Sequence, residues 1–171
     1  MAGLYISYQI KTKMIILGID PGFARTGYGV IEEKNKNLRV LDYGCLSTPA
    51  GLVFEKRLEK IREGLVDLIK KFKPSVCAVE KIFFCKNAKT AIDVGQARGV
   101  VILTAAEKNL KILEFTPLQV KQCITGYGKA EKQQVQKMVK ILLDLEEIPR
   151  PDDAADALAL AIAGSNNFLT K

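Results

Sequence analysis

Carboxylates stand in apolar parts of this sequence, where packing gives no reason for a charge. Asp20 and Glu80 each end a short apolar run, and Asp153 and Asp156 lie near the start of the run 152–163. An ionised carboxylate beside buried apolar surface persists only when it is paired or binds a metal ion, and neither of the two shorter runs contains a basic residue. In a chain with no histidine, such oxygen ligands suit Mg2+ or Mn2+ rather than zinc. The pattern indicates metal-dependent chemistry on phosphate.

Four carboxylates gathered in one place would need such ions. At a separation of about 4 Å, each pair would repel by roughly 4 kcal/mol at an effective dielectric near 20. Two divalent ions about 3.5 to 4 Å apart can activate a water on one side of a phosphodiester and stabilise the leaving 3′ oxygen on the other. We therefore predict a two-metal nuclease site whose catalytic and metal-binding residues are Asp20, Glu80, Asp153 and Asp156.

Each acid also has a purely structural interpretation. Asp20 can form the turn at the Pro-Gly that follows it, Glu80 can be a solvated strand end, and Asp153 can complement a helix N-terminus. Asp156 fits this interpretation worst, because it lies deeper in a run that is otherwise Ala, Leu and Ile. Asp152 lies four residues before Asp156 and shares its side of a helix, so spacing alone does not choose between Asp152 and Asp153.

Composition limits the class of protein. The 171 residues are 48% apolar, enough for one core, and 26 Lys and Arg against 19 Asp and Glu give a net charge of +7. This charge predicts a polyanionic partner, although an ordinary basic protein would also fit. The lack of histidine excludes Ser-His-Asp and Cys-His catalysis. No run approaches the roughly 18 apolar residues that span a membrane, and the N-terminus lacks a signal-peptide pattern, so we expect a cytoplasmic protein without membrane contact.

The four cysteines do not form a recognisable metal or disulfide pattern. Neither the CxxC spacing of a metal knuckle nor the cysteine density of a secreted disulfide scaffold is present, so reduced core thiols are expected. The cysteines are Cys45, Cys77, Cys85 and Cys123.

The hydrophobic pattern predicts one domain with a mixed sheet. Residues 1–13 have no clear periodicity and are expected to be an extension outside the fold, and residues 14–168 form the domain. Three consecutive strands imply antiparallel pairing, and helices then alternate with two further strands. This order predicts an α/β layered domain with helices on both faces of the sheet. The expected strands are 14–20, 27–33, 38–48, 75–80 and 111–115; the expected helices are 55–72, 87–107, one from Pro117 capped by Thr116, 130–145, and one from Asp152 with Gly164 as its C-terminal stop.

Several short motifs together resemble a known family. They are Ile16-Leu-Gly-Ile-Asp-Pro-Gly22, Thr26-Gly-Tyr-Gly-Val30, Val79-Glu-Lys-Ile-Phe83, Gly95-Gln-Ala-Arg-Gly99, Gln119-Val-Lys-Gln122, Ala130-Glu-Lys132 and Asp153-Ala-Ala-Asp-Ala-Leu158. Any one of them is a weak signal, but their order and spacing from about residue 14 to 163 resemble RuvC, the bacterial Holliday junction resolvase family of the ribonuclease H-like superfamily. The resemblance implies a three-layer α/β/α fold with a five-stranded mixed sheet.

The resemblance also implies an activity and its residues. Such enzymes resolve four-way junctions in DNA recombination and repair by paired symmetric nicks, with two Mg2+ ions per active site for which Mn2+ substitutes. The four catalytic acids of the family fall on the set predicted above, which favours Asp153 over Asp152. The second acid, Asp152, departs from the family pattern; it could compete as a ligand, but we expect it to cap the helix.

Three further residues acquire roles in DNA binding from the resemblance. Lys121 and Lys132 are expected near the scissile phosphate, and Phe83 is expected to stack on a junction base, which is worth roughly 1 to 3 kcal/mol. The alternatives are solvated lysines, in a protein with this net charge, and a phenylalanine packed in the core.

The resemblance implies protein partners as well. Gly95 and Gly99 stand in a helical stretch, where each costs about 1 kcal/mol relative to alanine, so something is expected to approach closely. This can be the homodimer interface that such resolvases form around this helix, or packing on the parent sheet. A homodimer suits the near two-fold symmetry of a four-way junction. Cooperation with the RuvA and RuvB branch-migration proteins is expected too.

Other functions remain as alternatives. Another ribonuclease H-like nuclease would share the acids but not the whole set of motifs. The turn at Asp20-Pro-Gly22 also resembles the phosphate loop of actin-like phosphotransferases, but those need two such domains, and the second such motif, Asp93-Val-Gly95, falls within a predicted helix. A binding protein that had lost catalysis would have no reason to keep a repulsive cluster of acids.

Overall fold

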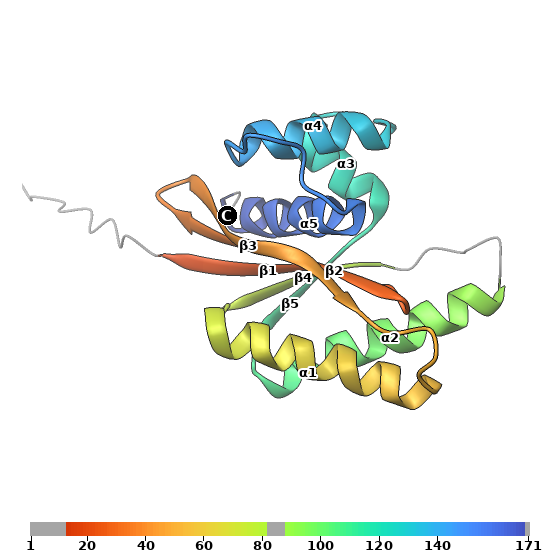
Figure 1. Ribbon diagram of the computed structural model, residues 1–171. Helices are drawn as coiled ribbons and strands as arrows, with labels where there is room; N and C mark the ends of the chain where they lie inside the picture. The colour runs from red at the N-terminus through yellow and green to blue at the C-terminus, as the bar shows by residue number, and fades with distance from the viewer. Residues whose placement is uncertain (1–12, 82–87, 170–171) are drawn as a thin grey trace, which may run out of the picture.

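The structure is a computed structural model that describes residues 13–81 and 88–169, and its elements follow the predicted order (Figure 1). The strands are β1 (Met14–Asp20), β2 (Arg25–Lys34), β3 (Asn37–Ser47), β4 (Val76–Glu80) and β5 (Lys111–Phe115). The helices are α1 (Phe54–Phe72), α2 (Ala88–Glu107), α3 (Pro117–Thr125), α4 (Lys132–Leu142) and α5 (Asp152–Leu169).

The five strands form one mixed sheet in the order β3-β2-β1-β4-β5. The first three strands pair antiparallel, and β4 and β5 run parallel to β1. This arrangement confirms the five-stranded mixed sheet, and it places the C-terminal ends of β1, β4 and β5 at the same edge. In α/β sheets, ligands bind at such an edge.

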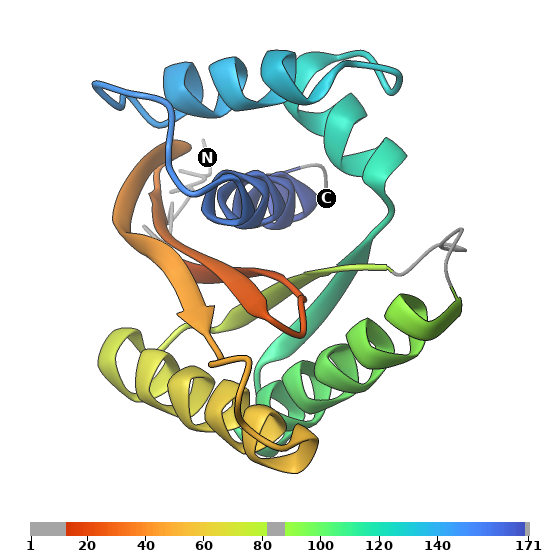
Figure 2. The same cartoon turned by 45° about the vertical axis from the view of Figure 1, so that its right-hand side comes forward.

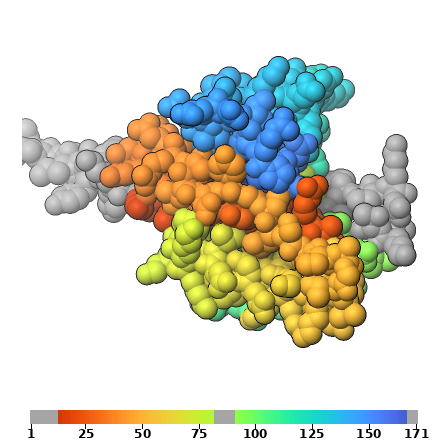
Figure 3. Space-filling model, viewed as in Figure 1, coloured from red at the N-terminus to blue at the C-terminus, as the bar shows by residue number. Residues whose placement is uncertain are grey.

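Helices cover both faces of the sheet, as predicted. Seen almost along its axis, α5 lies on one face with α3 and α4 outside it, and α1 and α2 lie side by side on the other face (Figure 2). On the surface viewed in Figure 1, β3 separates α1 from the chain around α4 (Figure 3). Alternate residues of β4 enter the two cores, Val76 and Ala78 on the α5 side and Cys77 and Val79 on the side of α1 and α2.

Helix α5 lies unusually close to the sheet because glycines face it. A Cβ atom on Gly18 of β1 would lie 2.0 Å from the carbonyl oxygen of Ala157, and a Cβ atom on Gly27 of β2 would lie 2.0 Å from that of Asp153. No side chain fits in these spaces. The run Ala154–Ala163 is buried all along except at Asp156, so α5 is the central helix of the domain.

Element boundaries differ from the predicted ones by a few residues, and one predicted boundary is wrong. Gly164 does not stop α5, which continues to Leu169. The reason is packing: a Cβ atom on Gly164 would lie 3.1 Å from side-chain atoms of both Ala78 and Ile16, so glycine serves the close contact between helix and sheet. At the start of α3, in contrast, Thr116 forms the predicted cap within a complete capping box.

Residues 1–12 and Cys85 lie outside the described residues. Lys13, the last residue of the expected extension, forms an ion pair with Glu32 of β2. The other three cysteines are free thiols, as expected, but only Cys77 is fully buried. In the described part of the chain, no helix is long and apolar enough to cross a membrane.

Candidate active site

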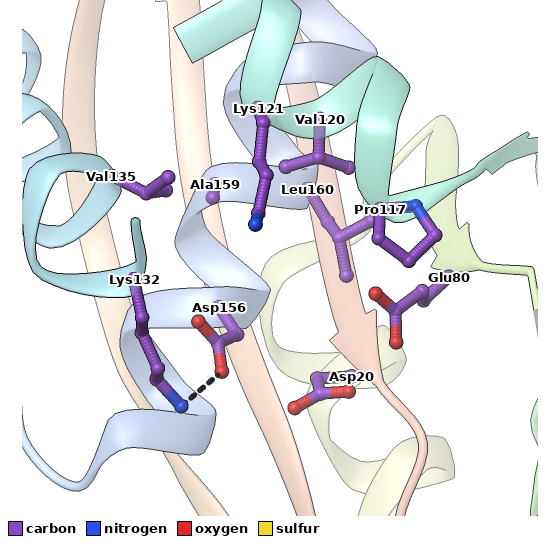
Figure 4. Close-up of a pocket in the computed structure, with 10 residues that line it drawn as sticks. All are labelled: Asp20, Glu80, Pro117, Val120, Lys121, Lys132, Val135, Asp156, Ala159 and Leu160. Carbon is purple, nitrogen blue, oxygen red and sulfur yellow. Dashed lines mark hydrogen bonds and ion pairs between the residues drawn. The ribbon is translucent and has the colours of Figure 1, made fainter. Parts of the chain in front are cut away.

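A pocket of about 280 Å3 lies at the C-terminal edge of the sheet and collects most of the predicted site residues (Figure 4). Three of the four predicted acids line it, together with both predicted lysines: Asp20, Glu80, Asp156, Lys121 and Lys132. Apolar side chains complete its wall: Pro117, Val120, Val135, Ala159 and Leu160. The pocket therefore combines acidic, cationic and apolar side chains, and these come from five elements or their ends.

The parallel pairing of β1 and β4 brings Asp20 and Glu80 together. The register places Ile19 opposite Val79, so the next residues, Asp20 and Glu80, end the two strands side by side. Because side chains alternate along a strand, both carboxylates lie on the face covered by α5. Figure 4 shows both carboxylates among the side chains that line the pocket.

Asp156 reaches the pocket from α5 and is held there by Lys132. The Lys132 ammonium donates a hydrogen bond of 2.9 Å to Asp156 Oδ2, and the Asp152 carboxylate lies 3.5 Å from the same ammonium. Burial alone would lower the pKa of Lys132, but its bond to Asp156 and the charges of both aspartates raise the pKa overall. Lys132 therefore stays protonated and places a positive charge at the edge of the pocket.

Asp153 lies beside the pocket but does not line it. Its Oδ2 atom is 3.4 Å from Arg25 Nε and accepts a long contact of 3.9 Å from the thiol of Cys45. Burial first, and then the charge of Asp153, raises the pKa of Cys45 to about 11, so the thiol is neutral. The fourth predicted acid is thus next to the other three, with its carboxylate turned toward a cation on β2.

The electrostatics of the pocket are those of a crowded negative site. Burial, then the charges of Glu80, Asp156 and Asp153, raise the pKa of Asp20 to about 8. Burial and the charge of Asp156 also raise the pKa of Glu80. Burial raises the pKa of Asp156 despite the bond from Lys132. Carboxylates with raised pKa values bind cations readily, because a cation removes the repulsion that opposes their ionisation.

The donor set fits a hard divalent cation, but its members are not arranged around one. Among residues 13–81 and 88–169, no three Asp, Glu or Cys side chains form a group that could hold a metal ion as they stand. Two of the acids are instead paired with cations, Asp156 with Lys132 and Asp153 with Arg25. Asp20 and Glu80 supply carboxylate oxygens that suit Mg2+ or Mn2+, whereas the carboxylate of Asp156 is held by Lys132.

Two remaining predictions have different outcomes. Phe83 lies outside the described residues. Asp152 lies in the first turn of α5, where a negative charge complements the helix dipole, and its carboxylate pairs with Lys132 rather than lining the pocket.

Sequence reasoning missed two arginines that contact the predicted acids. Arg25 contacts Asp153, and Arg98 donates from Nε to the backbone carbonyl of Glu80 at 2.9 Å. Both arginines lie within or beside the motifs quoted above, so the signal was present. What the sequence lacked was a way to show which distant acid or carbonyl each arginine would meet.

Comparison with known proteins places this arrangement in context. The family model described as "Crossover junction endodeoxyribonuclease RuvC" matches residues 16–164. A protein of that name from Halothermothrix orenii is 55% identical over 155 residues, covering 91% of this chain and 94% of its own. Another, from Desulforamulus reducens, is 58% identical over 149 residues, covering 87% and 91%. The structure of Thermus thermophilus RuvC in complex with Holliday junction substrate superimposes with a TM-score of 0.87 at 34% identity, covering 92% and 96%.

Proposed function

The chain belongs to the RuvC family of crossover junction endodeoxyribonucleases, and from this premise we propose that it resolves four-way Holliday junctions in DNA recombination and repair. It does so by hydrolysing one phosphodiester bond in each of two opposed strands, which leaves symmetric nicks. We propose the cytoplasm as the place of this activity, because the substrate is DNA. The solved complex of the Thermus thermophilus protein with a Holliday junction supports the choice of substrate.

One observation carries the proposal: carboxylates from three distant parts of the chain converge in a pocket that two lysines also line. Burial first, and then the charges of Glu80, Asp156 and Asp153, raise the pKa of Asp20 to about 8, so ionisation of this carboxyl is costly in the metal-free pocket. A phosphodiesterase needs such carboxylates to hold cations beside a phosphate.

The proposed cofactor is a pair of Mg2+ ions, for which Mn2+ substitutes, held by Asp20, Glu80, Asp153 and Asp156. When bound, such ions lower the pKa of a water nucleophile and stabilise the leaving 3′ oxygen. The residues of the chain do the rest. Lys121 and Lys132 offset the charge of the scissile phosphate, and the apolar wall around Val120 and Leu160 limits access of water.

Cleavage of a four-way junction tests the proposal directly. We expect nicks in a labelled junction with Mg2+, none with EDTA, and none in a linear duplex of the same sequence. Products that a ligase can seal would show that the nicks are symmetric. Equal cleavage of the linear duplex, or cleavage in EDTA, would contradict the proposal.

Replacing Lys132 with methionine should slow cleavage roughly 100- to 1,000-fold, the scale of losing one group that stabilises developing charge in the transition state. Methionine keeps the aliphatic stem but removes the charge. Single-turnover rates at saturating junction measure the effect. Lys137, an exposed lysine on the same helix, provides the control: its replacement with methionine should leave the rate within about two-fold, and equal losses for both variants would exclude a specific role for Lys132.

The protein is proposed to act as a homodimer formed around α2. The exposed face of this helix carries Ile92 and Leu103, which are 61% and 57% exposed, with Gln96 and Gly99 exposed between them. Apart from its chain neighbours and the backbone of its own helix, no atom of the described residues lies within 4 Å of a Cβ built on Gly99, so packing on the parent sheet does not explain this glycine. A second copy of the chain explains both the apolar residues and the open space.

Replacing Leu103 with glutamate should convert the dimer to a monomer, because two charges would be buried at a symmetric interface. Sedimentation at micromolar concentration measures the change, and cleavage should fall to unpaired nicks. The matched control is Leu118→Glu on α3, since Leu118 is 60% exposed but lies away from α2. A dimeric Leu103→Glu variant would place the interface elsewhere.

Two further elements of the proposal concern DNA and its processing. Phe83 follows Glu80 by three residues and is proposed to stack on a base at the junction centre. RuvA and RuvB are the proposed partners that bring the junction to this enzyme by branch migration. Both rest on membership of the family.

A further inference from the structure

The backbone at the metal-binding end of β4 has a polar anchor on the side away from the pocket. Arg98 of α2 donates from Nε to the carbonyl oxygen of Glu80 at 2.9 Å, and its guanidinium also forms an ion pair with Glu114 of β5. The arginine side chain is 19% exposed. A guanidinium offers donors in a rigid planar fork, so one side chain holds two neighbouring strands at their ends.

This anchor lies at the last residue of β4, Glu80, which pairs with Phe115 of β5 but has no partner in the ladder with β1. Pairing of β4 with β1 stops at Val79, one residue before Glu80. On the β5 side, the Lys81 amide donates to Phe115 at 2.8 Å. The Glu80 carbonyl receives its hydrogen bond from Arg98, across the sheet from the α5 face on which the Glu80 carboxylate lies.

We infer that Arg98 is a positioning residue for Glu80: it fixes the last peptide of β4 so that the Glu80 carboxylate stays beside Asp20 in the pocket. Arg98 does not line the pocket, and it acts on the site only through the backbone. This inference rests on the proposed function, because it assigns Glu80 as a metal ligand.

The inference also connects two parts of the protein. Arg98 is adjacent in sequence to Gly99, which lies on the exposed face of α2. The same helix therefore presents one face to the proposed second copy and, one residue earlier, holds the strand end that carries Glu80.

Arg98→Gln tests the inference, with Mn2+ affinity measured by calorimetry without DNA. We expect about ten-fold weaker binding than in the wild type, a lower cleavage rate at saturating junction, and unchanged junction affinity in EDTA. Raising the Mn2+ concentration should restore much of the rate. Arg98→Lys keeps the charge but cannot reach both partners at once, so it should lie between the wild type and Arg98→Gln and remain informative if the latter fails to fold.

Two control variants separate positioning from general stability. Arg62→Gln removes another ion pair to α2, the one with Glu107, and should leave Mn2+ affinity within two-fold. Glu114→Gln removes the charge that pairs with Arg98 but leaves its bond to Glu80, and should weaken Mn2+ binding less than three-fold.

The outcomes distinguish this inference from the proposed function. Wild-type Mn2+ affinity in Arg98→Gln, or a loss in Glu114→Gln as large as that in Arg98→Gln, would overturn the positioning role of Arg98. Failure of the wild-type protein to bind Mn2+ at all would instead contradict the proposed function. Tenfold loss confined to Arg98→Gln, with partial retention in Arg98→Lys, supports the inference.

Discussion

Replacing Asp20 with asparagine should abolish junction cleavage while making the metal-free protein more stable at alkaline pH. Asp20 is the most strongly perturbed acid of the pocket, with a pKa raised to about 8 by burial and then by Glu80, Asp156 and Asp153. Loss of a carboxylate that holds a catalytic cation should lower the rate roughly 1,000-fold or more. This exceeds the 10- to 100-fold loss typical of residues that only hydrogen-bond to a metal ligand. A gain in stability together with a loss of activity would show that Asp20 serves catalysis at a cost in folding stability.

The sign of the stability effect follows from proton linkage. The pKa of Asp20 is about 8 in the folded protein and 3.8 as its ordinary value, so the folded state binds the proton more tightly. The contribution of Asp20 to the free energy of unfolding is fully present below pH 3.8 and is lost as the pH rises toward and through 8. The Asp20→Asn variant has no such loss, so it should exceed the wild type most clearly above pH 8.

Thermal unfolding in EDTA at pH 6 and pH 8.5, with single-turnover cleavage in Mg2+, measures both effects. The wild-type melting temperature should fall between the two pH values by more than that of Asp20→Asn, and Mn2+ should raise the melting temperature of the wild type at pH 8.5 but not of the variant. Asp67→Asn, a change of the same charge at an exposed position on α1, controls for net charge. Unaltered cleavage in Asp20→Asn would remove Asp20 from the site.

Replacing Gly27 with alanine should destabilise the protein by more than about 3 kcal/mol, well above the usual cost of one extra methyl group in a packed core. The new Cβ atom would lie 2.0 Å from the carbonyl oxygen of Asp153, and a backbone carbonyl of a central helix cannot turn aside as a side chain can. In a domain of this size, the melting temperature should fall by roughly 10 °C.

The Gly27 substitution should also affect the site, because the carbonyl oxygen that the new Cβ would clash with belongs to the first turn of α5. Displacing that turn moves Asp153, so Mn2+ affinity should fall even at temperatures where the variant is folded. Gly51→Ala is the control, since no described atom lies within 4 Å of a Cβ there; it should leave both melting temperature and Mn2+ affinity unchanged. A Gly27→Ala variant as stable as the wild type would mean that α5 can move away from β2 at little cost.

The positions of Asp20 and Glu80 could be predicted from the sequence because local patterns determine them. Each closes a buried strand, and alternation of side chains along a strand assigns its face. Asp156 could be predicted for a related reason, as one charge in a helix that is otherwise buried. The antiparallel pairing of the first three strands and the cap at Thr116 were also accessible, since both depend on neighbours in sequence.

What the sequence could not provide were contacts between distant segments. The continuation of α5 through Gly164 depends on Ile16 and Ala78, which make a glycine favourable where the helix touches the sheet. The partners of the acids have the same origin: Arg25 with Asp153, and Lys132 shared by Asp152 and Asp156. Periodicity and spacing carry no information about which side chains meet across such separations.

Helix α2 links the proposed dimer interface to the active-site pocket. Its outward face carries Leu103, and its inward arginine, Arg98, donates to the peptide carbonyl of Glu80. In the proposed dimer, a tilt of α2 would therefore displace the proposed metal ligand Glu80. Under this proposal, a monomer would hold Glu80 away from its working position, and efficient cleavage would require two copies bound at one junction. Cleavage of intact duplex DNA would then be rare, because it offers no junction at which two copies can pair.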